Sequence, residues 1–395
     1  MRIKAEPYKL INHIQNYEWG TRGKDAFIPN LLGFEGEEKP YAELWIGGHP
    51  NLSSEIIVGG EIYNLKDTVE QYPNEILGET VAIRFGNKIP FLLKVLSANQ
   101  ALSIQTHPNK KEAIELHKNE SKNYPDDNHK PEIAITLDSL SSLVGFRPLD
   151  EIENNIKMYP QLKEFIGDKR VAEYFLNKTK SGLKNLFSHM MHNSTENGKL
   201  EKVIKILKIS FEQKSERSQD EKLFLSLFEQ HGVDVGLLVL FFLNVVNLKS
   251  GEAIYTPAGI PHAYLEGNIV ECMANSDNVV RAGLSPKFKD ITQLTNILTY
   301  QFGKPELIGK ELNKNIHEYK VSAEEFRVDK VTLNSESIDF NTDNQIEIIL
   351  LTEGEITCNN FSIQKGESLL IPALLDNYTV TSKSKAVLFR VVVPH

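Results

Sequence analysis

The segment GEAIYTPAGIPH, from Gly251 to His262, has the pattern of a strand, a tight turn and a second strand. Pro257 and Gly259 are the residue types that supply the backbone of a tight turn between adjacent antiparallel strands. A similar segment, GESLLIPALLDN, begins at Gly366 and repeats the glycine, glutamate, proline and alanine at the same spacing. Two copies of one strand–turn–strand unit predict two related β domains.

Only the first copy carries a metal-binding side chain. Its pattern resembles the second motif of the cupin superfamily, whose members are jelly-roll barrels (double-stranded β-helices), and His262 matches the metal ligand of that motif. The second copy has Leu374 and Asn377 where the first has Gly259 and His262. We therefore predict that the C-terminal barrel is structural and binds no metal.

The pattern of apolar and polar residues changes in the middle of the chain. Residues 40–148 and 236–395 consist of short apolar or alternating runs separated by Gly, Pro, Asn and Asp, a pattern typical of antiparallel strands. Between about Asp150 and Gln230, apolar residues recur every three or four positions, which indicates amphipathic helices. The predicted fold is mainly β with an α-helical insertion: two cupin-type jelly-roll domains plus a helical domain.

Composition and charge exclude several classes of protein. The 395 residues carry a net charge of −9 with scattered Lys and Arg, which disfavours nucleic acid as a partner. The most apolar run, VGLLVLFFLNVV (235–246), is too short to span a membrane, and we expect it in the core. Two cysteines without CxxC pairing disfavour disulfides and a thiolate zinc site. The N-terminus lacks a signal-peptide pattern, so a cytoplasmic location is expected.

The segment SIQTHPNKKE (103–112) supplies further candidate ligands. On a strand, Gln105 and His107 share one face, together with Ser103, while Ile104 and Thr106 face the other way. Cupins usually have His-x-His at this place. An amide oxygen is a weaker ligand than imidazole, so Gln105 favours a Lewis-acid zinc over redox iron.

The third ligand is expected further along the chain. Generic cupin spacing nominates Glu112, but the sequence after Pro108 has the charged pattern of a solvated helix. Glu132, in NHKPEIAITL, begins a proline-led strand and is the better candidate. His129 has the opposite parity to Glu132 and is a weaker alternative. The acidic pair at 126 and 127 is expected to form an exposed turn.

Four groups of residues together resemble the type I mannose-6-phosphate isomerases, the zinc-dependent phosphomannose isomerases. They are YEWG; AELWIGGHP; LSIQTHP with YPDDNHKPEIA; and GEAIYTPAGIPHAYLEGNIVECMANSDNVVRAGLSPKFKD. The resemblance spans about residues 8–300. It implies one zinc ion per subunit, bound by Gln105, His107, Glu132 and His262, and an active-site arginine at Arg281.

The resemblance also implies an activity and a domain plan. The activity is interconversion of D-mannose 6-phosphate and D-fructose 6-phosphate through a zinc-stabilised cis-enediol(ate), feeding mannose metabolism and GDP-mannose supply. The expected partner is this small sugar phosphate. The protein is expected to be a monomer that binds neither nucleic acid nor membrane. The implied plan is a discontinuous catalytic jelly roll (1–20, 96–148 and 236–310), a helical insertion (149–235) and a second, metal-free jelly roll (21–95 and 311–395).

Proton transfer needs a base, and Glu271, in IVEC, is the first choice because it is expected on the next alternating strand after His262. Lys130, two residues before Glu132, is a candidate acid or anchor. Tyr264, two residues after His262, shares its parity and is expected to hydrogen-bond a sugar oxygen.

The phosphate group needs fixed positive charge in an acidic protein. Arg281 and Lys287 are close in sequence and are expected to bind it, with Ser103 donating a hydrogen bond. Arg281 is equally suited to stabilise the enediolate directly. The two roles stay open at this stage.

Other functions fit the sequence less well. A different metal-dependent cupin, either another sugar-phosphate isomerase or an iron dioxygenase, is the main alternative, but Gln105 and the cationic candidates disfavour a dioxygenase. A non-catalytic sugar-binding cupin is disfavoured because the four ligands and Arg281 are all present. For Glu43, in AELW, a buried partner for a basic residue is favoured over a place in the pocket.

Overall fold

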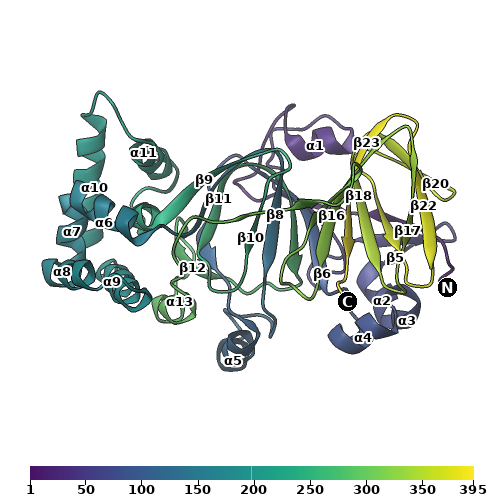
Figure 1. The fold of residues 1–395 in the computed structure, drawn as a ribbon, viewed down its shortest axis with the longest axis horizontal. Coiled ribbons are helices and arrows are strands. Elements are labelled where there is room, and N and C mark those ends of the chain that lie inside the picture. The colour runs from purple at the N-terminus through teal and green to yellow at the C-terminus, as the bar shows by residue number, and fades with distance from the viewer. Residues whose placement is uncertain (197) are drawn as a thin grey trace.

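The computed structural model describes residues 1–196 and 198–395. It places a helical layer at one end of the molecule and three β-sheets of ten, nine and four strands in a row beside it (Figure 1). The predicted mainly β fold with a helical insertion is confirmed. In the described ranges, no helix combines the length and the apolar character needed to cross a membrane.

The ten-stranded sheet is built around two long strands. β8 pairs with β10 through its first residues, with β9 through its last residues and with β11 over most of its length, so different parts of one strand serve different neighbours. The strands of this sheet are β2 (His13–Gln15), β3 (Glu43–Ile46), β6 (Phe91–Ala98), β7 (Ile104–Thr106), β8 (Glu132–Phe146), β9 (Leu243–Lys249), β10 (Ala253–Thr256), β11 (His262–Ala274), β12 (Val280–Gly283) and β13 (Leu307–Ile308).

The nine- and four-stranded sheets come mostly from the C-terminal part of the chain. One apolar core lies between them, and a second core lies between the nine- and ten-stranded sheets. The nine-stranded sheet contains β1 (Tyr8–Ile11), β4 (Glu55–Val58), β5 (Glu61–Asn64), β14 (Lys310–Glu311), β15 (Ile316–Tyr319), β16 (Arg327–Asn334), β18 (Glu347–Glu353), β21 (Ser368–Ile371) and β23 (Lys385–Val392). The four-stranded sheet contains β17 (Ser337–Asn341), β19 (Glu355–Cys358), β20 (Phe361–Gln364) and β22 (Asn377–Thr381).

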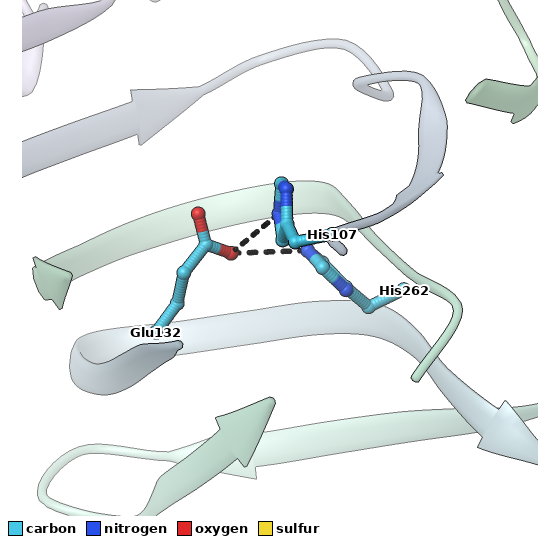
Figure 2. A group of neighbouring side chains, drawn as sticks. All are labelled: His107, Glu132 and His262. Atoms are coloured by element: carbon cyan, nitrogen blue, oxygen red, sulfur yellow. Dashed lines mark ion pairs between the residues drawn. The ribbon is translucent and has the colours of Figure 1, made fainter. Parts of the chain in front are cut away.

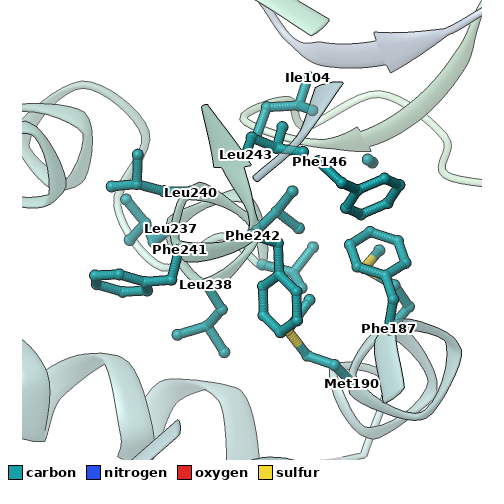
Figure 3. Close-up of a cluster of buried hydrophobic side chains, with 14 of the residues drawn as sticks. Ile104, Phe146, Phe187, Met190, Leu237, Leu238, Leu240, Phe241, Phe242 and Leu243 are labelled. Atoms are coloured by element: carbon teal, nitrogen blue, oxygen red, sulfur yellow. The ribbon is translucent and has the colours of Figure 1, made fainter. Parts of the chain in front are cut away.

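A helical insertion lies between β8 and β9. It begins at α6 and ends with α11, and the apolar run 235–246 follows it as the expected buried segment, packed against helices and β-strands (Figure 3). The helices are α1 (Phe27–Leu32), α2 (Leu65–Gln71), α3 (Pro73–Ile76), α4 (Glu79–Phe85), α5 (Lys110–Glu120), α6 (Leu149–Met158), α7 (Pro160–Ile166), α8 (Asp168–Leu176), α9 (Lys180–Asn193), α10 (Lys199–Glu212), α11 (Gln219–His231), α12 (Gly236–Val239), the 3-10 helix η1 (Leu240–Phe242) and α13 (Ile291–Ile297).

Strand pairing differs from the predicted domain plan near the N-terminus. β1, which the plan gave to the catalytic barrel, pairs with β21 and β4 in the nine-stranded sheet. β3 and the start of β6, which the plan gave to the second barrel, pair with each other in the ten-stranded sheet. Partners far away in the sequence leave no local signal, and so an alternating pattern identifies a strand without identifying its neighbour.

The two copies of the strand–turn–strand unit have the same local structure. Gly251 and Gly366 precede β10 and β21 and have φ values of 84° and 89°, in the left-handed region that favours glycine. The carboxylates of Glu252 and Glu367 each accept a hydrogen bond from the backbone N–H three residues earlier, at 2.8 and 2.9 Å. The repeat seen in the sequence is therefore a repeat of structure.

Candidate active site

Three buried side chains converge from the ends of three strands (Figure 2). His107 follows β7, Glu132 begins β8 and His262 begins β11. Oε2 of Glu132 lies 3.4 Å from Nε2 of His107 and 3.0 Å from Nε2 of His262. These ligand atoms all lie within 4.8 Å of one another, a spacing that suits a single metal ion. The structure thus brings together three of the four predicted ligands.

Backbone carbonyls orient both imidazole rings. Nδ1 of His107 donates to the carbonyl of Asn278 at 2.7 Å, and Nδ1 of His262 donates to the carbonyl of Ile260 at 3.0 Å. The unprotonated Nε2 of each ring therefore faces Glu132. Both Nε2 atoms and Oε2 of Glu132 are buried and have no hydrogen-bond partner among the described residues. Buried polar atoms are seldom left unpaired, and a cation would satisfy all three.

The protonation states also suit a metal ion. Burial lowers the pKa of His107, which favours the neutral ring. Burial alone would raise the pKa of Glu132, but His107 and Lys130 outweigh it and hold that pKa well below its ordinary value. A neutral imidazole and an ionised carboxylate are the forms that bind metal.

Gln105, the fourth predicted ligand, lies beside this cluster. It pairs directly with His262 across β7 and β11, and its Oε1 accepts a hydrogen bond from Oγ of Ser103 at 3.4 Å. Ile104, on the other face of β7, packs into the helical core (Figure 3). The strand parity predicted for this segment is confirmed, and two imidazoles, one carboxylate and one amide form a donor set that zinc accepts.

The rejected ligands have other partners. The side chain of Glu112 accepts a hydrogen bond from the backbone of Asn109 at 2.9 Å, in a capping box that begins α5. Nε2 of His129 lies 2.6 Å from Oε1 of Glu325, a buried residue of the C-terminal part. Neither side chain belongs to the group of possible metal ligands that the structure brings together.

The prediction of an exposed turn at the acidic pair was wrong for its first member. Asp126 is half-buried and accepts hydrogen bonds from the hydroxyl of Ser276 at 2.8 Å and from the backbone of Asp277 at 2.7 Å. It thereby fixes the loop whose Asn278 carbonyl orients His107. Only the tertiary structure places this loop, which is about 150 residues away, against Asp126.

A second buried charged group lies next to the ligands. Nζ of Lys94 on β6 is 3.4 Å from the carboxylates of both Glu43 and Glu271, and it lies 5.0 Å from the ring centre of Trp45. Burial would lower the pKa of Lys94, but the carboxylates outweigh it and raise that pKa. Burial also raises the pKa of Glu271, with Lys94 opposing. The favoured interpretation of Glu43 as a buried partner of a basic residue is confirmed.

The sequence reasoning missed Lys94. The signal was present, since Lys94 is the only charged residue in the apolar run IPFLLKVL, and every residue of β6 is buried. A lone cation in a buried strand requires nearby carboxylates, because an unpaired buried charge is strongly unfavourable.

Glu271 is buried next to the cluster, although its strand differs from the prediction. It lies on the same strand as His262, the long β11, and not on the next one. Two irregularities in the β11–β8 register change the side-chain parity between these residues. Gly267 lies at the second irregularity with φ 134°, where a Cβ atom would lie 2.1 Å from the carbonyl oxygen of Ser139. Bulges of this kind cannot be predicted from the alternation of apolar and polar residues.

Lys130 and Tyr264 also lie close to the ligands. Nζ of Lys130 is 3.3 Å from Oε1 of Glu132, although β8 begins only at Glu132. The ring of Tyr264 lies 6.3 Å from that of His262, and its buried hydroxyl group has no hydrogen-bond partner among the described residues. Both residues thus lie beside the group formed by His107, Glu132 and His262.

The two predicted phosphate-binding cations differ in exposure. Arg281 on β12 pairs with Gln105 on β7, and its half-buried guanidinium has no hydrogen bond or ion pair within the described ranges. Burial lowers the pKa of Arg281, which no neighbouring carboxylate offsets. Lys287 is exposed on the loop after β12. A half-buried, unpaired guanidinium beside the ligand strands is suited to binding an anion.

Known proteins resemble this chain over most of its length. A family model for the catalytic domain of type I phosphomannose isomerase matches residues 8–149. Mannose-6-phosphate isomerase 2 of Arabidopsis thaliana is 36% identical over 98% of this chain and 93% of its own. The mannose-6-phosphate isomerase of Rattus norvegicus is 35% identical over 96% of this chain and 94% of its own.

Solved structures give the same result. The mannose 6-phosphate isomerase of Salmonella typhimurium, in a crystal structure with its substrate (f6p) and zinc, is 31% identical to this chain. The two structures superpose with a TM-score of 0.87, covering 98% of this chain and 100% of the other. A holo, zinc-bound structure of mannose 6-phosphate isomerase has the same TM-score.

Proposed function

The chain belongs to the type I mannose-6-phosphate isomerases, and from that premise we propose that Gln105, His107, Glu132 and His262 form its zinc site. The protein interconverts mannose 6-phosphate and fructose 6-phosphate with zinc as cofactor. The observation that carries the proposal is the set of three buried, unpaired ligand atoms on His107, Glu132 and His262.

The isomerisation moves a proton between C2 and C1 of the sugar through a cis-enediol(ate) whose oxygens carry negative charge. Bound zinc supplies a Lewis acid that stabilises this charge. Glu271 is the proposed base, which takes the proton from C2 and returns it to C1. Burial raises the pKa of its carboxyl, which makes it a stronger base than an exposed glutamate, and Lys94, at 3.4 Å, keeps it oriented.

Lys130 and Tyr264 are the proposed contacts to the sugar oxygens. The ammonium of Lys130 is buried beside Glu132 and can donate both to that carboxylate and to a hydroxyl group of the substrate. The hydroxyl group of Tyr264 is buried without a partner, and a sugar oxygen would satisfy it. Both donors orient the reacting carbons relative to Glu271.

The phosphate is proposed to bind Arg281, Lys287 and Ser103. Ser103, just before β7, donates a hydrogen bond to Gln105, and Arg281 lies opposite Gln105 in the β7–β12 pair. Both contacts support a phosphate next to the ligand strands. Arg281 has an alternative role in stabilising the enediolate. Arg281→Ala separates the two roles: loss of phosphate binding raises KM, whereas loss of enediolate stabilisation lowers kcat.

The finer architecture is also a proposal. We infer that the ten-stranded sheet forms a catalytic cupin jelly roll, and that the nine- and four-stranded sheets form a second, metal-free one. The matching turns before β10 and β21 support two related barrels. A monomer acting in the cytoplasm, without nucleic acid or membrane, remains a prediction that gel filtration and cell fractionation would test.

Metal analysis with a coupled isomerase assay tests the function. We expect purified protein to contain zinc and to convert mannose 6-phosphate, to lose both properties on chelation, and to regain activity when zinc is added back. A protein that converts no mannose 6-phosphate, with or without added zinc, would contradict the proposal.

A further inference from the structure

The loop after β12 is held from the helical side of the molecule. It carries Lys287 and directly follows the strand of Arg281, so it belongs to the proposed phosphate-binding segment, residues 281–289. Asp234, in the link between α11 and α12, is the residue that holds it. Its side chain is buried, with 8% of its surface exposed.

Asp234 makes three contacts with its two carboxylate oxygens. Oδ1 accepts the backbone N–H of Gly236 at 2.7 Å and that of Leu284 at 2.6 Å. Oδ2 lies 3.1 Å from Nζ of Lys289. One buried carboxylate therefore holds both ends of the loop 284–289, and charged hydrogen bonds of this kind are stronger than neutral ones.

The backbone at this contact has little freedom. Leu284 has φ 52°, an uncommon conformation for a residue with a side chain. A Cβ atom on Gly283 would lie 2.4 Å from Cα of Gly236, so the backbones of these two segments are in direct contact. The hydrogen bond from Leu284 to Asp234 stabilises a turn that the loop would not adopt by itself.

Asp234 is attached to a rigid part of the molecule. The segment that follows it, α12 and η1, is completely buried among helices and β-strands (Figure 3). Just before it, Oε1 of Gln230 accepts the backbone N–H of Ala101 at 2.9 Å, two residues before Ser103. The end of the helical insertion thus contacts both chain segments that are proposed to bind the phosphate.

We propose that Asp234 is a positioning residue that preorganises Arg281 and Lys287 for the phosphate group of the substrate. The inference rests on the proposed function, because it assigns the phosphate to these residues. It gives the helical insertion a role in substrate binding. Asp234 itself touches neither the zinc ligands nor the buried charged group around Lys94.

The test is steady-state kinetics on the zinc-loaded full chain with Asp234→Ala. We expect KM for mannose 6-phosphate and the inhibition constant of inorganic phosphate to rise together by about tenfold, while kcat falls by less than about threefold. Zinc content should not change. Unchanged KM and inhibition constant, or a loss confined to kcat, would overturn the proposal.

Asp234→Asn is the conservative variant, because it keeps the volume and an acceptor oxygen but loses the charge that faces Lys289. We expect it to restore most of the binding, with KM raised by about two- to threefold. It also carries the test if Asp234→Ala does not fold, since wild-type KM in Asp234→Asn would then overturn the proposal.

Glu221→Gln is a matched control in the same insertion. Glu221 is buried, with 2% of its surface exposed, and contacts Tyr159 and Lys214 away from the loop. We expect a lower melting temperature with unchanged KM, whereas a rise in KM equal to that of Asp234→Ala would mean general loosening and overturn the proposal.

Failure of the phosphate assignment is distinguishable from failure of the positioning role. If Arg281→Ala and Lys287→Ala leave KM and phosphate inhibition unchanged, the phosphate assignment is wrong and the inference about Asp234 falls with it. If those two variants weaken binding while Asp234→Ala does not, only the inference about Asp234 is wrong.

Discussion

The two β units have the same strand frame around different side chains. In the ten-stranded sheet, Glu132 on β8 lies opposite Thr256, the last residue of β10. In the nine-stranded sheet, Glu347 on β18 lies opposite Ile371, the last residue of β21. A proline follows each of these strands, and so Glu347 occupies the place of the proposed ligand Glu132.

The neighbouring positions of the second unit have changed. His262 begins β11 opposite Gln105, whereas Asn377 begins β22 opposite Asn341. In the same register, Arg390 takes the place of Glu271, because each lies opposite the residue two positions after the shared glutamate. The second unit thus has Asn377 in place of the imidazole of His262, and the cation Arg390 in place of the acid Glu271.

In the second unit, Arg390 forms ion pairs with the acidic side chains at the positions that correspond to the first unit's site. Its Nε lies 2.6 Å from Oε2 of Glu347, and its Nη1 lies 3.0 Å from Oδ2 of Asp329, which takes the place of Lys94. In the first unit, the corresponding glutamate keeps an unpaired oxygen between two histidines. A shared frame therefore supports either a metal site or a closed ion-pair network, and the side chains decide which.

The largest expected effect separates the two glutamates. Glu132→Ala should reduce bound zinc to near zero and turnover by about a thousandfold or more, because a Lewis acid contributes several kcal/mol to the transition state. Glu347→Ala should keep its zinc. Elemental analysis and the isomerase assay measure both.

Glu112→Ala serves as a control that keeps zinc and loses about 1 kcal/mol of stability with its cap. Zinc loss in Glu112→Ala, with zinc retained in Glu132→Ala, would restore the generic cupin ligand set.

The next effect separates the two arginines in catalysis. Arg281→Ala should keep its zinc and lose about a hundredfold or more in kcat/KM, because an unpaired, half-buried cation beside the site stabilises substrate charge. Arg390→Met should isomerise at the wild-type rate per zinc. Wild-type rates in Arg281→Ala would remove that residue from the mechanism.

Substitution of Arg390 is expected to reduce stability more than substitution of Arg281, the opposite of their order in catalysis. Arg390→Met leaves Glu347 buried without its cation, while Asp329 keeps its ion pair with Arg327. We expect the change to lower the free energy of unfolding by about 3–5 kcal/mol. Urea titration followed by fluorescence measures the loss. Adding Glu347→Gln to Arg390→Met should restore part of it, because the uncompensated charge is removed. A loss below about 1 kcal/mol in the single variant would mean that the network contributes little.

The smallest expected effect lies at the contact between the units. Glu325 from the C-terminal unit contacts His129, the residue before Lys130. Burial would raise the pKa of Glu325, but the effect of His129 is larger, and the pKa of Glu325 is therefore lowered. A lowered pKa adds stability above the ordinary value of 4.5, and this stability is lost as the pH falls through the lowered pKa. Glu325→Gln should therefore cost about 1 kcal/mol near pH 7. The difference from wild type should vanish in acid, and a difference independent of pH would contradict the pairing.

Most residues of the candidate site could be predicted from the sequence, but less of the strand pairing could. Ligand spacing and strand parity, which are local properties, nominated Gln105, His107 and Glu132, and the structure places His107 and Glu132 in one group with Gln105 beside it. Lys94 was missed because a buried lysine is explained only by partners on other strands, here Glu43 and Glu271. The single strand from His262 to Glu271 was missed because register irregularities are decided by neighbouring strands. The partner of β1 was missed for the same reason.

The pairing of β1 with β21 has a consequence for synthesis of the chain. Lys9 forms an ion pair with Glu367, which lies 358 positions later. At 5–20 residues per second, a ribosome needs roughly 20–70 s to make the intervening chain, and during that time β1 can pair with β4 but lacks its other neighbour, β21. The nascent protein therefore exposes an apolar strand edge until translation is nearly complete, and a message truncated before β21 yields a chain prone to aggregation.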